Sequence, residues 1–286
     1  MKIKEKIRLF LALLLPLQIC CGCVKESENK TRIVKIKDLS AGASSSSCLM
    51  KSGIDIFDMD TLNDFHQKLD ADDSTNMEKA DWFNGGFFGC DFIKDNVRFA
   101  DEHMELWLTE ADVDSRHDCK YSGAEYRTRD TYGYGMYAVE MKPIKNKGVV
   151  SSFFTYTRNE DGSNWDEIDI EFLGKDTTKV QFNFYVDGVG KHEYLYDLGF
   201  DASDAFHEYG FLWLEDRIMW FVDHIPVCMF TSMQGNLPDT PGKIMMNVWN
   251  GDNSKSTTHW LGRYDGVTEL HADYKSFVYT PVISHK

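Results

Sequence analysis

Residues 165–172 read Trp-Asp-Glu-Ile-Asp-Ile-Glu-Phe, with polar and apolar side chains in alternation. Successive side chains of a β-strand point to opposite faces of the sheet. The stretch therefore predicts a strand whose buried face carries Ile168, Ile170 and Phe172. Its other face carries carboxylates only, although Asp and Glu are poor strand formers and no Lys or Arg is interleaved.

The three carboxylates of that face are Glu167, Asp169 and Glu171. A solvated polar face is one interpretation, but three like charges in a row repel one another. Glycoside hydrolysis is a chemistry that uses such a row, because two carboxyl groups flank the bond that breaks. The backbones of Glu167 and Glu171 should lie about 13 Å apart, so side chains that lean together would suit a retaining pair. The charge of Asp169 between them would favour a protonated neighbour.

Alternation continues beyond this stretch and predicts an all-β fold. Residues 179–185 place Val180, Phe182 and Phe184 on one face, and residues 211–214 and 217–222 form a hairpin pattern. Short strands at regular intervals are typical of a sandwich or barrel. Other strands are expected at 151–157, 243–249 and 273–280, and a helical stripe is found only at 59–69.

Composition excludes several classes of function. The 286 residues carry a formal net charge of −15, which would repel nucleic acid. A charged fraction of 27% and a mean hydropathy of −0.41 exclude a multi-span membrane protein. The sequence contains no HExxH motif, no Gly-x-Ser-x-Gly elbow and no dinucleotide fingerprint. A cofactor or a catalytic metal is therefore not expected.

The N-terminal residues indicate export. A basic start precedes an apolar run at 9–17, which is too short to span a bilayer and is typical of a signal peptide. Small residues before Cys23 resemble a bacterial lipobox, so we expect residues 1–23 to form a lipoprotein signal and Cys23 to carry the lipid. A plain signal, giving a secreted or periplasmic protein, is the alternative. Residues 24–52 would form a polar flexible tether and 53–286 a single catalytic domain, which contacts the membrane only through the lipid.

Residues 165–178, WDEIDIEFLGKDTT, closely resemble the active-site strand of bacterial lichenases, the mixed-linkage β-glucanases of glycoside hydrolase family 16. The resemblance covers nearly all of residues 80–280. Matching blocks are TYGYGMY (131–137), SSFFTYT (151–157), KVQFNFY (179–185), LGFDAS (198–203) and TPGKIMMNVWNG (240–251).

This resemblance implies an all-β jelly-roll sandwich of the concanavalin-like type, with an open concave cleft. It implies retaining endo-hydrolysis of β-1,4 bonds adjacent to β-1,3 bonds in lichenan and barley β-glucan, by a monomer that needs no cofactor. Glu167 would be the nucleophile and Glu171 the general acid/base, assisted by Asp169. The spacing Glu-x-Asp-x-Glu is the unbulged form of lichenases, whereas laminarinase-type relatives usually carry one more residue.

The resemblance also places residues in the cleft and at structural positions. It implies a disulfide bond between Cys90 and Cys119, while Cys228, in an apolar run, is expected to be a buried thiol. A structural calcium common in lichenases would meet Lys275, which cannot ligate it. Backbone oxygens could still hold a structural calcium ion, but the sequence does not support such a site. Substrate-binding positions are Trp82, Asn84, Phe88, Glu125, Arg127, Phe154, Tyr156, Trp165, Asn183, Tyr185, Asn247, Trp249 and Trp260.

Three alternatives stay open at this point. Two are enzymes, a laminarinase-type β-1,3-glucanase and a glucan transglycosylase. The third is a non-catalytic, lectin-like glucan-binding module, since lectins share this sandwich. The three carboxylates argue against a lectin, because binding alone does not require carboxylates that repel one another.

Overall fold

The structure, a computed structural model, describes residues 32–34, 54–56, 65–112 and 119–282. The expected signal peptide at 1–23, its Cys23 and most of the expected tether at 24–52 lie outside these ranges. Strands β1 (Arg32–Val34) and β2 (Ile54–Ile56) pair with each other in antiparallel fashion.

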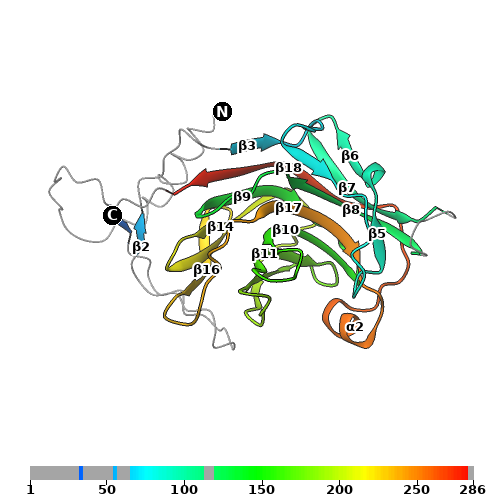
Figure 1. The fold of residues 1–286 in the computed structure, drawn as a ribbon. Coiled ribbons are helices and arrows are strands. Elements are labelled where there is room, and N and C mark those ends of the chain that lie inside the picture. Colours follow the sequence, from blue (N-terminus) through cyan, green and yellow to red (C-terminus); the bar gives the residue numbers. More distant parts are fainter. Residues whose placement is uncertain (1–31, 35–53, 57–64, 113–118, 283–286) are drawn as a thin grey trace.

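The remaining strands form a jelly-roll sandwich of two curved layers, so the predicted fold class is confirmed (Figure 1). We call the first layer the inner sheet. It runs in the order β13 (Tyr194–Asp197), β12 (Lys179–Tyr185), β11 (Asp166–Leu173), β10 (Val149–Thr157), β17 (Lys243–Asn250) and β8 (Tyr121–Thr128), and β4 (Met77–Lys79) also pairs with β8.

The second layer, the outer sheet, arches over the inner one in Figure 1. It runs in the order β16 (Ile225–Thr231), β15 (Arg217–Val222), β14 (His207–Trp213), β9 (Gly135–Lys142), β18 (Leu270–Pro281), β7 (His103–Glu110) and β6 (Val97–Ala100), and β3 (Phe65–Lys68) pairs with β18. β7 and β8 pair at one edge and so join the layers, and β5 (Cys90–Phe92) pairs with β8 in parallel.

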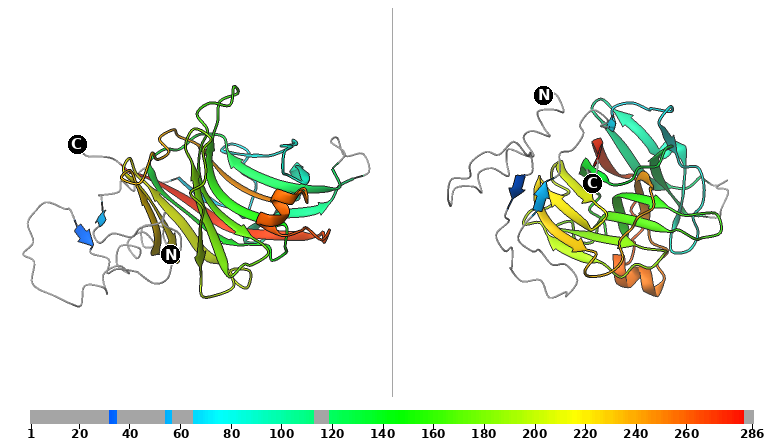
Figure 2. Two further views of the ribbon diagram at one scale, coloured as in Figure 1. Left: turned by 90° about the horizontal axis from the view of Figure 1, so that it is seen from below. Right: turned by 60° about the vertical axis from the view of Figure 1, so that its left-hand side comes forward.

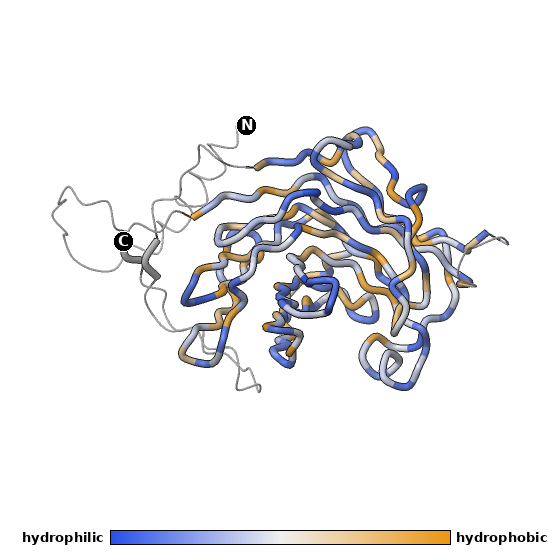
Figure 3. The backbone as a smooth tube through the Cα atoms, viewed as in Figure 1, coloured by the Kyte–Doolittle hydropathy of each residue, from blue (hydrophilic) through white to orange (hydrophobic). Residues whose placement is uncertain are grey.

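The hydrophobic core fills the space between the sheets. Ile168, Ile170 and Phe172 of β11 are fully buried, as the alternation predicted. Phe172 meets Tyr209 of β14 edge to face, with ring centroids 4.8 Å apart. Figure 3 shows apolar and polar residues in alternation along many of the strands. Burying one face of each strand leaves the opposite face of the inner sheet for a site.

The predicted hairpins are present. β14 and β15 pair across Leu214, Glu215 and Asp216, and β15 continues into β16 through a tight turn. In that turn Asp223 and His224 adopt positive φ angles of 46° and 68°. Two-residue turns of this conformation match the twist of the strands they connect.

The helical prediction was wrong where the structure can test it. Residues 65–68 form strand β3, because they pair with β18, and residues 59–64 lie outside the described ranges. A helix that the sequence did not indicate, α2 (Lys255–Leu261), follows β17. Ser254 caps it by accepting a hydrogen bond from the backbone N–H of Thr257. Figures 1 and 2 show α2 at one end of the sheets. A one-turn 3₁₀ helix spans Lys94–Asn96.

The cysteine predictions were also wrong. No disulfide bond joins Cys90 to Cys119. Cys90 lies opposite Tyr121 in the ladder, and its sulfur packs beside Gly123. Burial raises the pKa of the Cys90 thiol to about 12. Cys228 is buried, as expected, but it is disulfide-bonded and therefore not a thiol.

In the described part of the chain, α2 is too short to cross a bilayer, and no other helix there combines the necessary length and apolar character.

Candidate active site

The three carboxylates of β11 lie together on the open face of the inner sheet. Glu167, Asp169 and Glu171 alternate with residues of the core, and β11 pairs with both neighbouring strands without a shift in register. The strand therefore carries no bulge, as the spacing predicted. Its register partners on β10 and β12 are Tyr156 and Tyr185 for Glu167, Phe154 and Asn183 for Asp169, and Ser152 and Gln181 for Glu171.

Two aromatic side chains of the outer sheet donate hydrogen bonds to the backbone of β11 and β10 from the core side. The indole N–H of Trp220 donates a hydrogen bond of 3.1 Å to the backbone carbonyl of Asp169. The hydroxyl of Tyr274 donates a bond of 3.0 Å to the carbonyl of Ser152 on β10. These bonds cross the core and fix the backbone beneath the carboxylates.

Burial makes the carboxylates hold protons more tightly than usual. Desolvation raises the pKa of Glu167 to about 7. Desolvation, followed by the charge of Glu167, raises the pKa of Glu171 to about 8. The pKa of Asp169 is raised well above its ordinary value, first by desolvation and then by the charges of its two neighbours. Burial therefore favours the protonated form of all three carboxyl groups.

Glu167 and Glu171 have different hydrogen-bond partners. The indole N–H of Trp165 donates a bond of 2.8 Å to Oε2 of Glu167, and the side chain of Asp169 is also bonded to Glu167. Both bonds favour the ionised form of Glu167. The side-chain amide of Gln181 donates a bond of 2.7 Å to Oε2 of Glu171.

A buried carboxylate next to the site ties two loops to β11. Oδ1 of Asp166 accepts a hydrogen bond of 3.1 Å from the backbone N–H of Asp187. Oδ2 accepts bonds of 2.9 and 3.1 Å from the N–H groups of Asp239 and Thr240. The loop at Asp187 packs on Trp165, because the N–H of Gly188 donates to the Trp165 carbonyl. Asp166 therefore positions the tryptophan that contacts Glu167.

Two aromatic groups border the carboxylates. Near Glu167, the rings of Trp165 and Tyr185 stack with centroids 5.2 Å apart, and Tyr156 lies 6.2 Å from Trp165. At the Glu171 end, the ring centroids of Phe88 and Trp249 lie 4.5 Å apart. The ring centroids of Trp249 and Trp260 of α2 lie 5.9 Å apart. Such rings offer apolar faces on which sugars can stack.

A network of polar side chains extends from β10 across β17 to β8. Ser152 donates a hydrogen bond of 2.5 Å to Asn247, whose amide approaches Oε2 of Glu125 at 3.4 Å. Among the described residues, Oε1 of Glu125 has no hydrogen-bond partner, and the guanidinium of Arg127 lies 3.8 Å away. Burial raises the pKa of Glu125 to about 7.

Three predicted substrate-binding residues, Trp82, Asn84 and Arg127, come from β8 and from the loop between β4 and β5. The guanidinium of Arg127 lies 4.2 Å from the centroid of the Trp82 ring, so one face of this ring is already covered. Asn84 is exposed in the loop between β4 and β5. The other predicted positions, Phe154 on β10 and Asn183 on β12, lie beside Asp169.

Sequence reasoning missed Gln181, Ser152 and Phe87 as site residues. Gln181 shares the face of Asn183 and Tyr185, so the alternation along β12 could have identified it. Ser152 occupies the corresponding position on β10, two residues before Phe154. Phe87 contacts Trp249 with centroids 5.4 Å apart, which required knowledge of how the loop folds back.

Lys275 makes contacts that suit a cation and not a metal ligand. Its ammonium forms an ion pair of 3.0 Å with Glu140 and lies 4.2 Å from the centroid of the Phe206 ring.

Comparison with known proteins identifies close relatives. The family "Glycosyl hydrolases family 16" matches residues 85–268. A β-glucanase of Paenibacillus polymyxa is 50% identical over 220 residues, which are 76% of this chain and 88% of that protein. A β-glucanase of Acetivibrio thermocellus is 53% identical over 209 residues, which are 73% of this chain; there the match spans only 60% of the relative's length.

A solved structure shares the fold and half of the sequence. It is a prokaryotic β-1,3-1,4-glucanase (lichenase) derived from a mouse hindgut metagenome. The TM-score is 0.72 at 50% identity, and the match covers 77% of this chain and 99% of that one.

Proposed function

Since the chain belongs to glycosyl hydrolases family 16, we propose that it cleaves internal β-1,4 bonds next to β-1,3 bonds in mixed-linkage β-glucans, with retention of configuration. Relatives that share half of its sequence are named β-glucanases, and the solved relative is named a lichenase. The substrate class is therefore a β-glucan polysaccharide.

The observation that carries this proposal is the row of Glu167, Asp169 and Glu171 on one face of an unbulged strand. Retaining glycosidases need one carboxylate as nucleophile and one carboxylic acid as proton donor. Hydrogen bonds from Trp165 and Asp169 favour the ionised form of Glu167, which suits a nucleophile. We therefore assign the nucleophile to Glu167 and the general acid/base to Glu171.

The reaction proceeds in two steps. Glu171 gives its proton to the glycosidic oxygen while a carboxylate oxygen of Glu167 attacks the anomeric carbon, so the leaving glucan departs and a glycosyl ester forms. Glu171, now ionised, then takes a proton from water, which attacks the same carbon and releases Glu167. Two inversions give net retention, and the chemistry uses carboxyl groups of the chain with no cofactor.

Asp169 and Trp165 stabilise the charge of Glu167 between these steps. Burial raises the pKa of Asp169, and in its protonated form its hydroxyl donates to the Glu167 carboxylate. The indole of Trp165 donates to the other side of the same group. These donors lower the nucleophile's pKa without adding a charge to the site.

Specificity for mixed linkages would come from the walls of the cleft. A β-1,3 bond kinks a glucan chain, whereas runs of β-1,4 bonds are nearly straight. The aromatic groups at the two ends of β11 offer stacking surfaces, and Glu125, Arg127 and Asn247 offer oriented polar contacts. A misplaced kink would leave polar groups unpaired, at a cost of about 1–3 kcal/mol for each buried group.

Digestion of barley β-glucan, laminarin and carboxymethylcellulose, followed by product analysis, tests the proposal. We expect tri- and tetrasaccharides with a β-1,3 bond at the reducing end from barley glucan, and little release from the other two substrates. Equal rates on laminarin and barley glucan would instead favour the laminarinase-type reaction, and longer transfer products would favour a transglycosylase. Binding to glucan without hydrolysis would favour the lectin-like module.

We also infer that the enzyme is exported and anchored through Cys23. The basic start, the apolar run at 9–17 and the small residues before Cys23 support this. Labelling of cells with a fatty-acid probe should mark the wild-type chain and not a Cys23→Ala variant. Label that persists in the variant would exclude this anchor.

A further inference from the structure

A second cluster of ionisable side chains lies on the outer face of the outer sheet. His103 and Glu105 alternate along β7 with Met104 and Leu106, which are fully buried in the core. Asp273 of β18 lies between Ala272 and Tyr274, and Tyr274 reaches through the core to β10. His103, Glu105 and Asp273 therefore point away from the catalytic cleft.

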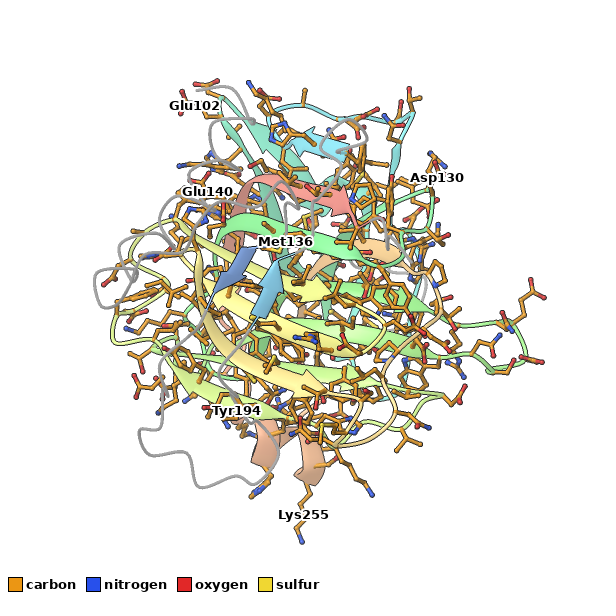
Figure 4. All side chains as sticks on the ribbon, turned by 90° about the vertical axis from the view of Figure 1, so that its left-hand side faces the viewer. Glu102, Asp130, Met136, Glu140, Tyr194 and Lys255 are labelled. Carbon is orange, nitrogen blue, oxygen red and sulfur yellow. The ribbon has the colours of Figure 1, made fainter. Side chains whose placement is uncertain are left out.

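The figures agree with this separation. In Figure 4, Glu102, which precedes β7, and Glu140 of β9 lie at the opposite side of the molecule from Tyr194 of β13 and Lys255 of α2. The cluster between β7 and β9 therefore belongs to a different surface from the carboxylates of β11.

The ladder places two carboxylates directly opposite each other. Glu105 and Asp273 are register partners on β7 and β18. Like charges at such a position are destabilising unless a cation compensates them. The ammonium of Lys142 on β9 lies 2.6 Å from Oδ2 of Asp273, and the imidazole of His271 lies 2.6 Å from Oδ1. Oδ1 of Asp273 and Oε1 of Glu105 also face His103.

The distances within the cluster match the edges of a small coordination polyhedron. Nε2 of His103 lies 3.5 Å from Oε1 of Glu105 and 3.7 Å from Oδ1 of Asp273. One ligand atom from each of the three residues lies within 4.8 Å of the others. Tetrahedral ligands at about 2.0–2.1 Å from zinc lie about 3.4 Å apart, so only small side-chain movements would be needed.

Neighbouring side chains orient the carboxylates as second-shell groups of metal sites do. The indole N–H of Trp107 donates a hydrogen bond of 2.9 Å to Oε2 of Glu105, which leaves Oε1 toward His103. The imidazole of His271 lies 2.6 Å from Oδ1 of Asp273 and stacks near Trp107, with centroids 4.6 Å apart. Hydrogen bonds of this kind fix ligand orientation and raise affinity.

We propose that His103, Glu105 and Asp273 bind a divalent transition-metal ion, with zinc as the ion that fits best. One imidazole and two carboxylates are ligands that zinc accepts, with water completing the shell. Calcium is disfavoured because it takes oxygen ligands only. The alternative is an ion pair of protonated His103 with the two carboxylates and no metal.

Titration of the full chain with zinc chloride by calorimetry, at pH 7.5 after removal of metals, tests the site. We expect saturable binding of one ion, and at least tenfold weaker binding in His103→Gln and in Asp273→Asn. Glu105→Gln is a third variant, since Glu105 is more exposed than Asp273 and its change disturbs folding less. Circular dichroism checks that each variant folds.

A matched control is His207→Gln. His207 also pairs with an aspartate, Asp223, at 2.8 Å, but no third ligand of this kind accompanies the pair in the part of the chain that the structure describes. The His207→Gln variant should therefore bind zinc as tightly as the wild type. Lys142→Met removes a cation beside Asp273 and should tighten binding severalfold.

The site and the proposed hydrolysis are independent, so either can fail alone. Zinc should raise the melting temperature of the wild type and not of His103→Gln, and cobalt should give the visible absorption of a tetrahedral site. The proposal would be overturned if the wild type showed no saturable zinc binding, or if His103→Gln and Glu105→Gln bound zinc as tightly as the wild type. Calcium that binds more tightly than zinc would overturn it as well.

Discussion

The side-chain amide of Gln181 donates a hydrogen bond of 2.7 Å to Oε2 of Glu171, and its oxygen accepts a bond of 3.2 Å from the indole N–H of Trp260. Gln181 thus connects the proposed acid/base on β11 to helix α2. It orients one oxygen of Glu171 and leaves the other for the glycosidic bond.

Replacing Gln181 by Leu should raise the pKa of Glu171, because a hydrogen bond to the ionised carboxylate is lost. Since Glu171 must be protonated to act, the alkaline limb of kcat/KM should move to higher pH. We expect kcat to fall about tenfold through loss of orientation. An unchanged alkaline limb, measured on an oligosaccharide substrate, would show that Gln181 does not act on Glu171.

Removing either proposed catalytic carboxylate should nearly abolish hydrolysis and preserve the fold. We expect losses of at least about 1000-fold for Glu167→Gln and Glu171→Gln. With an activated aryl glycoside, azide should restore turnover of Glu167→Ala and give the inverted product, since a small anion replaces the nucleophile. For Glu171→Ala azide should give the retained product. The exchange of these two outcomes would reverse the assignment.

The raised pKa values predict a stability that falls as the pH rises. Glu171 has a folded-state pKa of about 8 against an ordinary value of 4.5, so the native state binds more protons between these values. Unfolding then becomes easier as the pH rises through this window. Glu171→Gln carries no charge there and should melt a few degrees above the wild type at pH 8. At pH 4.5 the two should melt nearly together; a constant difference at both pH values would exclude this cause.

Asp166 should be needed for the loops that flank the site. In Asp166→Asn one acceptor becomes a donor, so at least one backbone N–H of Asp187, Asp239 or Thr240 loses its partner. We expect a loss of about 1–3 kcal/mol in the free energy of unfolding, measured with urea. Asp161→Asn is the control, because Asp161 caps an exposed turn at Ser163 and should cost much less.

Local periodicity was sufficient for the strands but not for contacts between distant segments. Alternation placed Ile168 in the core and Asp169 on the open face, and the resemblance of 165–178 placed Trp165 beside Glu167. Helix α2 was missed because its residues, Lys255–Leu261, are rich in Ser and Thr and it depends on its cap at Ser254. The bond from Trp260 to Gln181 depends on how that helix docks, which no spacing in the sequence reveals.

Glu125 should contribute to substrate binding through an oxygen that has no partner in the described part of the chain. Oε1 is buried and lacks a hydrogen bond, while Oε2 is approached by Asn247. A sugar hydroxyl that donates to Oε1 would satisfy this atom, and an unsatisfied buried polar atom costs about 1–3 kcal/mol. Glu125→Ala should therefore reduce kcat/KM on barley glucan by about 10- to 100-fold, chiefly through KM. Glu125→Gln keeps an acceptor and should lose less. If both variants retain the KM of the wild type, Glu125 does not contact the glucan.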